Sequence, residues 1–478
     1  MFGTRATYTR PVRSPLIRSY LRNRWALLGP ILLTAFWIPG SWQGWPRTDS
    51  HYYAAIGLQA WRTGNLWSLH MGDAPYLNKP PLAFWIHGLF LWILGPSMWA
   101  IRLPSLLAAI GACAAVTWAV RTTAGRTTAL LTGLVLATTV EFFRYTRAIS
   151  LDTWMTLWLA LCLACAAAAA APARPRPRAL VLMALPLGLG LMTKPFIALM
   201  APLIIGAWFI WLGRARLLPI LALGTVLGLA VAAPWHLSME SRYPGIFWKT
   251  YLFEQSIDRA SESVEPWWYY LRIMAEKYWP WLALLVAAAV SFASRPARLP
   301  ARSRRVVVLA LAWSGAWLLA LSLFGGKSGR YAMPVYLTLG VPIAAWLAAL
   351  SGPRRPGRLA LAWLGPAAVA GSLVACAAVA ALGLRVHAPR FAPWDDLAAR
   401  LAANPGQQLL TSPAANSLAA NVYLITGRWP PLASLENEKP GRTPRPGDWI
   451  ILDSRERAWQ GLGEIVTENE GFRVVQAR

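Results

Sequence analysis

Two aspartates, Asp49 and Asp152, are the strongest candidates for chemistry in this chain. Asp49 lies in the segment RTDSHYY, and Asp152 follows two arginines in RYTRAISLDTW. A carboxylate can accept a proton from an attacking hydroxyl, and two carboxylates on one rim support acid/base work or a shared divalent cation. His51 is the only nearby soft ligand, and a lone histidine is weak support for a metal. The alternative for Asp49 is an N-cap of a helix that begins near Ser50.

Cationic side chains in two further segments suit a phosphate. Lys79 precedes two prolines in NKPPL, which restrict the backbone and can start a helix. Its charge fits a lipid-linked phosphate at membrane depth, although a lysine that reaches for the head groups is the simpler alternative. In GGKSGRYAMP, at 325–334, three glycines allow a close backbone approach beside Lys327, Arg330 and Tyr331. This composition favours anion binding.

The segment 236–278 is rich in aromatic residues and arginines. Aromatic rings near a membrane surface are commonly anchors at the head-group level. Some of them could instead stack on a sugar or line a lipid groove. Arg259, in EQSIDRASES, is the residue of this segment that we expect to touch substrate.

Hydrophobic stretches must position these residues. The chain is 56% hydrophobic with a mean hydropathy of +0.41, which is typical of a membrane protein. A span needs roughly 20 mostly apolar residues. Eleven stretches qualify, with eleven to thirteen as the range: 25–41, 103–120, 127–143, 151–172, 179–193, 196–213, 217–235, 279–294, 306–324, 332–350 and 359–383. A shorter apolar stretch, 82–95, is expected to lie at the interface.

Charge predicts which side each loop faces. Short loops rich in Lys and Arg stay in the cytoplasm, and here these are the loops around Arg174 to Arg178, Arg214 and Arg216, Arg295 to Arg305, and Arg354 to Arg358. The basic N-terminus, 1–24, is then cytoplasmic. The acidic residues of the first 384 positions all fall on the other side: Asp49, Asp73, Glu141, Asp152, Glu240, Glu254, Asp258, Glu262, Glu265 and Glu276. A carboxylate kept near a bilayer is a functional candidate.

The predicted organisation has three parts. A membrane domain at 25–384 carries the outward loops 42–102, 144–150, 236–278 and 325–331. From 385 to 478 the chain is polar, and short β-like runs such as DWIILD with a helical patch at 394–403 predict a small outward α/β domain. The net charge of +26 is dispersed over many short loops, so it indicates topology and anionic lipid rather than nucleic acid.

These pieces, in this order, resemble the membrane glycosyltransferases that use polyprenyl-phosphate sugars, in the branch of the lipid A aminoarabinose transferases and protein O-mannosyltransferases. The resemblance covers roughly 25–340 and is fairly specific as a set. The matching features are Asp49 with Tyr52 and Tyr53; Lys79-Pro80-Pro81-Leu82; Arg102-Leu103-Pro104-Ser105; Arg147 with Asp152; Lys194-Pro195; Pro234-Trp235; Arg259; Pro280-Trp281; and Lys327 with Arg330, Tyr331 and Pro334.

The resemblance implies an all-α polytopic fold of the GT-C type, with helices around an outward cavity and loop helices on the periplasmic side. It implies an undecaprenyl-phosphate sugar donor, Asp49 as catalytic carboxylate with Asp152 as its partner, and Lys79, Arg259 and Tyr331 on the donor phosphate. Lys327 and Arg330 add charge there, while Tyr52, Tyr53, Asn78 and Arg147 line the substrate. Ser50 and Asn78 stand where the family often has glutamate, and both departures weaken a metal site.

The sequence therefore predicts an inverting glycosyltransferase in a bacterial inner membrane, with its active site facing the periplasm. The acceptor is lipid A, a glycan or a protein. No cofactor is required by the sequence, and a divalent cation at Asp49, Asp152 and His51 is left open. The alternative is a transporter or flippase of lipid-linked sugars, which should show inverted repeats or broken helices; neither is evident in the sequence.

Overall fold

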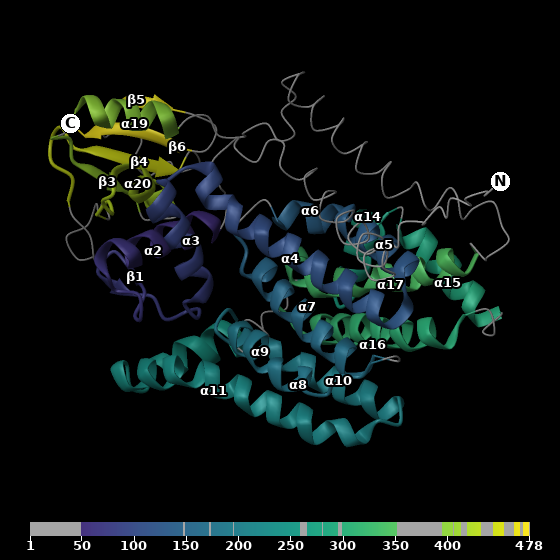
Figure 1. Ribbon diagram of the computed structural model, residues 1–478. Helices are drawn as coiled ribbons and strands as arrows, with labels where there is room; N and C mark the ends of the chain where they lie inside the picture. Colours follow the sequence, from purple (N-terminus) through teal and green to yellow (C-terminus); the bar gives the residue numbers. More distant parts are fainter. Residues whose placement is uncertain are drawn as a thin grey trace, which may run out of the picture.

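The computed structural model describes residues 49–146, 149–171, 174–194, 196–258, 265–279, 281–294, 299–350, 394–404, 406–412, 418–431, 443–453, 463–468 and 472–477. Most of the chain folds into helices that pack side by side, and a small sheet lies at one end of them (Figure 1).

The helices of the first 350 residues fall into long spans and shorter pieces. The long ones are α4 (Met98–Ala124), α7 (Leu151–Ala169), α11 (Leu218–Arg242), α16 (Ala301–Leu323) and α17 (Met333–Leu350). The shorter ones are α2 (Asp49–Thr63), α3 (Leu82–Leu94), α5 (Arg126–Ala137), α6 (Val140–Thr146), α8 (Ala179–Leu182), α9 (Ala184–Leu191), α10 (Met200–Trp211), α12 (Ile246–Trp248), α14 (Tyr269–Lys277) and α15 (Trp281–Ser294).

Within the described residues, five helices are long and apolar enough to cross a membrane, or six if α14 and α15 form one bent span. The protein is thus a multi-span, mostly helical membrane protein. The predicted spans at 127–143, 179–193 and 196–213 are shorter in the structure: α5 ends at Ala137, α8 and α9 together form a helix of Ala179–Leu191, and α10 with the 3-10 turn before it covers Ile197–Trp211. The predicted spans 25–41 and 359–383 lie outside the described residues.

Small residues set the distance between α4 and α7, which form the centre of the helical part. Ala112, Ala160 and Ala167 are among the alanines of these helices that are almost fully buried. In a membrane, helices associate through close packing rather than through hydrophobic burial, and small side chains permit it. The larger space beside α5 and α17 is filled by bulky groups. Trp313 of α16, for example, is fully buried and donates to the carbonyl oxygen of Pro334 at 2.9 Å.

Helices α2 and α3 cross in direct backbone contact. A Cβ atom at Gly88 of α3 would overlap the carbonyl group of Gly57 in α2, and one at Gly57 would lie 2.5 Å from the carbonyl oxygen of Phe84. His87 then ties α3 to its neighbours: its Nδ1 lies 3.1 Å from the carbonyl oxygen of Ile101 in α4, and its Nε2 accepts from the indole of Trp154 in α7 at 3.0 Å. One end of the bundle is thereby fixed.

The C-terminal part is a small mixed sheet with two helices, α19 (Trp394–Ala403) and α20 (Ala419–Thr426). Its strands are β3 (Leu409–Thr411), β4 (Trp449–Asp453), β5 (Gly463–Glu468) and β6 (Phe472–Ala477), in the order β3-β4-β6-β5. Strand β3 pairs with β4 in parallel, and the other two pairs are antiparallel. The prediction of a helix at 394–403 and of strands in DWIILD and FRVVQAR is confirmed.

This part docks on α2 and on the hairpin of β1 (His70–Met71) and β2 (Ala74–Pro75). The indole of Trp429 donates to Oε1 of Gln59 at 2.7 Å, and Gln59 in turn bonds both polar backbone groups of Gly72. Arg62 of α2 lies over the ring of Tyr423, with 5.6 Å from its Cζ to the ring centroid. The sheet therefore braces the helix that begins at Asp49.

Candidate functional site

The buried carboxylate of Asp152 is the centre of a charge cluster. It lies in the first turn of α7, and only 6% of the residue is exposed. Lys194 donates from Nζ to Oδ1 of Asp152 in a short ion pair, and Nε of Arg330 lies 3.8 Å from Oδ2. Two cations thus face one carboxylate, which leaves the cluster with a net positive charge.

Tyr331 completes this cluster. Nζ of Lys194 lies 4.5 Å from the centroid of the Tyr331 ring, and Cζ of Arg330 lies 5.6 Å from it. The short 3-10 turn Gly329–Ala332 presents both residues just before α17. A cation over an aromatic face is stabilised by the ring's negative face, so Tyr331 helps to hold the ammonium beside Asp152.

The turn that carries Lys194 is held from two sides. The indole of Trp158, two turns along α7 from Asp152, donates to Oγ1 of Thr193 at 3.0 Å. On the other side the backbone N–H of Leu82 donates to the carbonyl oxygen of Met192 at 3.2 Å. Phe196, just beyond, has a φ of 53° and 43% exposure. A left-handed non-glycine residue costs about 1–2 kcal/mol, and such strain is typical of functional loops.

The hydrogen bond between the backbones of Leu82 and Met192 also brings the predicted Lys79 segment close to the cluster. Lys79 lies three residues before Leu82, and Lys194 lies two residues after Met192. Asn78 and Lys79 are both half-buried at the start of α3. Both predicted cationic segments, Lys79 and Arg330 with Tyr331, therefore adjoin the turn of Lys194 at one end of the helices.

Predicted Tyr52 and Tyr53 lie on the first turns of α2. Tyr53 is buried and packs edge-on against Phe84 of α3, with ring centroids 5.1 Å apart. Tyr52 is half-buried and its ring centroid lies 4.7 Å from that of the buried His51. In this conformation Tyr53 supports α3, while Tyr52 keeps access to the surface.

Lys327 is held by the backbone. Its ammonium donates to the carbonyl oxygens of Phe324 at 2.7 Å and of Glu265 at 3.2 Å. The hydroxyl of Tyr270 in α14 also meets the backbone of Ser328, 3.3 Å from both its oxygen and its nitrogen. Tyr270 thus fastens the glycine-rich loop to α14, and Lys327 ties it to Glu265, which precedes that helix. Its role toward a donor phosphate stays a prediction.

Glu141 and Tyr145 of α6 lie behind this loop; from the sequence, Glu141 stood only among the outward carboxylates and Tyr145 was not singled out. Glu141 is 2% exposed and lies 3.6 Å from the guanidinium of Arg144. A Cβ atom at Gly329 would lie 2.9 Å from the Tyr145 hydroxyl, so a larger residue there would displace the Tyr145 side chain. Burial, and next the Glu141 carboxylate, raise the pKa of Tyr145 to about 12. Tyr145 therefore stays protonated and can donate to Glu141.

Several predicted residues lie wholly or partly outside the described residues. Helix α2 begins at Asp49, but the position of the Asp49 side chain lies outside what is described. Arg147 and Arg259 fall outside it too. Among the described residues, no group of three His, Cys, Asp or Glu side chains could hold a metal ion. A cation at Asp49, Asp152 and His51 stays a prediction.

Lys194 is the residue that the sequence analysis passed over. Lys194-Pro195 was a matching feature of the resemblance, yet no role followed from it. The signal that could have found Lys194 is its place in the short turn between the predicted spans 179–193 and 196–213.

Comparisons with known proteins agree with this architecture. Residues 78–237 match the family described as dolichyl-phosphate-mannose-protein mannosyltransferase. The undecaprenyl phosphate-alpha-4-amino-4-deoxy-L-arabinose arabinosyl transferase of Pectobacterium carotovorum is 31% identical over 370 residues, 75% of this chain and 64% of that protein. Its counterpart in Erwinia tasmaniensis is 30% identical over 66% of this chain and 56% of that protein.

The fold comparison covers almost the whole chain. The crystal structure of ArnT from Cupriavidus metallidurans bound to undecaprenyl phosphate has a TM-score of 0.74 at 17% identity, covering 97% of this chain and 98% of that one. The chain is related to the aminoarabinose transferases and has the ArnT fold. The archaeal oligosaccharyltransferase AglB from Archaeoglobus fulgidus is more distant, with a TM-score of 0.54 at 12% identity.

The family match at 78–237 and the similarity in sequence to the arabinosyl transferases, together with the ArnT-like fold, confirm the resemblance to polyprenyl-phosphate-sugar glycosyltransferases. The matched part of the chain spans between 56% and 64% of the length of these two curated relatives.

Proposed function

We propose that the chain is a glycosyltransferase that moves a sugar from undecaprenyl phosphate, or a similar polyprenyl phosphate, to an envelope acceptor such as lipid A, a glycan or a protein. The observation that carries this proposal is the cationic cluster of Lys194 and Arg330 around Asp152 and Tyr331. A departing lipid phosphate needs cations at membrane depth, and this cluster supplies them at one end of the helices.

In the proposed reaction, an acceptor oxygen attacks the anomeric carbon of the donor sugar. The bond from that carbon to the polyprenyl phosphate breaks, and its electron pair goes to the phosphate oxygen. The acceptor proton passes to the carboxylate of Asp49. One direct displacement inverts the anomeric centre. A phosphate acceptor, as on lipid A, carries its own charge and needs little base, whereas a hydroxyl acceptor needs one.

Asp152 has a positioning role in this proposal. Because Lys194 and Arg330 already engage its two oxygens, Asp152 holds these cations where a phosphate can reach them. Lys79 approaches from the start of α3, and Arg259, Lys327 and Tyr331 complete the predicted phosphate contacts. Tyr52, Asn78 and Arg147 would line the sugar, and Tyr53 would support them through α3.

The finer topology belongs to the same proposal. Eleven spans, with the N-terminus at 1–24 in the cytoplasm, put the cluster and the part from 385 to 478 in the periplasm of a bacterial inner membrane. Charge supports this orientation: no Asp or Glu occurs at 153–239 or 277–394, where Arg174 to Arg178 and Arg295 to Arg305 lie.

The test is mass spectrometry of lipid A, envelope glycans and undecaprenyl-phosphate sugars from cells with and without this protein, with Asp49→Asn run beside them. A product that loses one sugar while its lipid-linked donor accumulates supports the transferase and names both substrates. Donor lipid that redistributes between leaflets, with Asp49→Asn behaving as wild type, would favour the transporter.

A further inference from the structure

A cavity lies far from the Asp152 cluster, at the other end of helix α7. It holds about 550 Å³, and its walls come from α4, α7 and α8 and the loop that joins α7 to α8. Asp152 and Ala168 are sixteen residues apart in α7. At 1.5 Å per residue, about 24 Å separates the two sites along the helix axis. The cavity therefore opens near the opposite membrane face.

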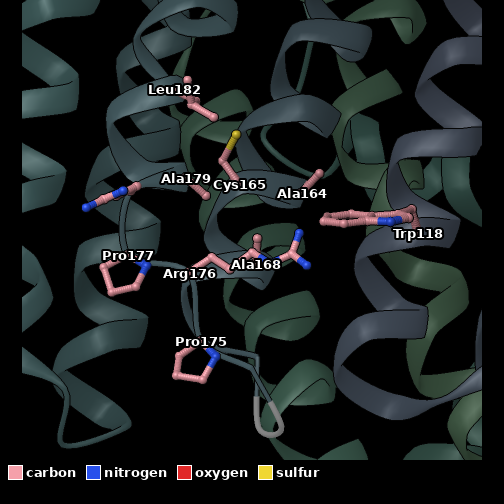
Figure 2. A pocket seen from close by; sticks show the side chains of 10 residues that line it. Trp118, Ala164, Cys165, Ala168, Pro175, Arg176, Pro177, Ala179 and Leu182 are labelled. Atoms are coloured by element: carbon pink, nitrogen blue, oxygen red, sulfur yellow. The ribbon is translucent and has the colours of Figure 1, made fainter.

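The cavity has an apolar body. Ala164, Cys165 and Ala168 of α7 line one side, and Leu182 of α8 and Trp118 of α4 lie around it (Figure 2). Its volume lies in the usual range for small-molecule sites, about 300–1,000 Å³. Tryptophan is enriched at the head-group level of membranes, which fits the position of Trp118 six residues before the end of α4.

The mouth of the cavity is strongly basic and rigid. The loop reads RPRPR from 174 to 178, so that arginines alternate with Pro175 and Pro177, each of which fixes its own φ. The backbone N–H of Arg176 donates to the carbonyl oxygen of Ala168 at 2.9 Å, which pins the loop to the end of α7. In Figure 2 the side chain of Arg176 extends toward the side of the cavity where Trp118 lies.

No carboxylate is available in the neighbouring sequence to balance this charge. Asp and Glu are absent from 74–140 and from 153–239, the segments that contain every residue lining the cavity. An apolar cavity with a cationic mouth at a membrane face is complementary to a molecule with an acyl chain and an anionic head group.

We propose that this cavity binds an anionic glycerophospholipid of the adjacent leaflet. An acyl chain lies along Ala164, Cys165 and Ala168, and the head-group phosphate meets Arg176 and Arg178. The site is separate from the one at Asp152, and its occupant is a structural lipid rather than the sugar donor. It anchors the loop between α7 and α8 to the membrane surface.

The test titrates the full-length, delipidated protein in detergent with phosphatidylglycerol or phosphatidylcholine, read by native mass spectrometry. Arg176→Gln/Arg178→Gln removes the cationic mouth. Arg302→Gln/Arg304→Gln is the matched control, because both arginines are exposed on a short basic segment away from the cavity and the change in charge is the same. At about 1 kcal/mol per arginine near a lipid surface, the first variant should weaken phosphatidylglycerol binding about thirty-fold. The control should change it less than about three-fold.

A second measurement locates the lipid. Phosphatidylglycerol with a photoreactive acyl chain should label the peptide that contains Ala164 to Ala168. Ala164→Leu keeps both arginines but fills the cavity, so it should reduce this labelling even if the arginine variant does not fold. Equal binding of phosphatidylcholine, an equal loss in the control variant, or displacement of the probe by undecaprenyl phosphate at lower concentration would each overturn the proposal.

Discussion

The ion pair between Asp152 and Lys194 gives the sharpest test of the site's architecture. Their side chains are only 8% and 14% exposed, and Arg330 adds a second cation at 3.8 Å. At an effective dielectric constant of about 20, one unit-charge pair near 4 Å attracts by about 4 kcal/mol before desolvation. Removal of one partner from a buried pair typically destabilises a protein by about 3–5 kcal/mol, because the other charge is left uncompensated.

Asp152→Asn should therefore destabilise the protein by about 3–5 kcal/mol, because it leaves two cations facing each other. Extrapolated to a chain of this size, that lowers the apparent unfolding midpoint in detergent by roughly 5 °C. Lys194→Met should destabilise the protein less than Asp152→Asn does, since Arg330 still faces Asp152. The double variant Asp152→Asn/Lys194→Met should recover at least about 2 kcal/mol relative to the sum of the single changes, as removal of a whole buried pair can be nearly neutral.

The assay is thermal unfolding followed by the loss of monodisperse protein on size-exclusion chromatography. Arg272→Gln is the control, because its pairs with Glu265 and Glu276 are exposed and 3.8 and 3.9 Å long, so the loss of both should cost less than about 1 kcal/mol. Additive effects of the two single changes, or a loss of stability in Asp152→Asn no larger than that in Arg272→Gln, would show that this ion pair does not stabilise the fold.

Three further predictions concern the elements around the site. Gly88→Ala should destabilise the protein by at least about 1–3 kcal/mol in thermal unfolding, because its Cβ would overlap Gly57. The control is Gly315→Ala, which has open space around it and should be neutral or slightly stabilising. Equal effects of the two variants would contradict the close crossing of α2 and α3. Burial lowers the pKa of His87 in the folded protein from 6.5 to about 3. As the pH drops from 6.5 to 5, His87 is therefore protonated in the unfolded chain but not in the folded one, and the free energy of unfolding should fall by about 2 kcal/mol. His87→Gln should flatten this pH dependence, and an unchanged slope would exclude His87 as its source. Trp429→Phe removes the hydrogen bond to Gln59 and should make the C-terminal part more sensitive to limited proteolysis. The control is Trp267→Phe, because the ring of Trp267 is exposed. Equal cleavage of both variants would argue against docking through Gln59.

The sequence predicted which segments meet better than it predicted which atoms pair. Sidedness alone placed Asp152, Lys79 and the loop with Arg330 on one side, because charge in short loops follows membrane topology. The pairing of Asp152 with Lys194 was not predicted. Lys194 lies 42 positions away, and nothing in a single sequence states that the turn after α9 packs against the start of α7.

Helix lengths show a second limit. The stretch 127–143 was predicted as one span, yet the structure divides it between α5, which ends at Ala137, and α6, which begins at Val140. An apolar run does not reveal such breaks, because a helix interrupted by packing against neighbours has the same composition as an intact one. The C-terminal strands were easier to predict, since short apolar runs with β-branched residues mark β4 and β6.

The most direct test of the central claim is sugar transfer by the purified protein in liposomes that contain an undecaprenyl-phosphate sugar and lipid A. Mass spectrometry would count glycosylated acceptor and released undecaprenyl phosphate. We expect equal amounts of both products with the wild-type protein and a loss of at least about a hundredfold in rate with Asp49→Asn, while donor binding survives. Transfer by Asp49→Asn at the wild-type rate would contradict the assigned role of Asp49, and the absence of either product with every envelope acceptor supplied would contradict the transferase itself.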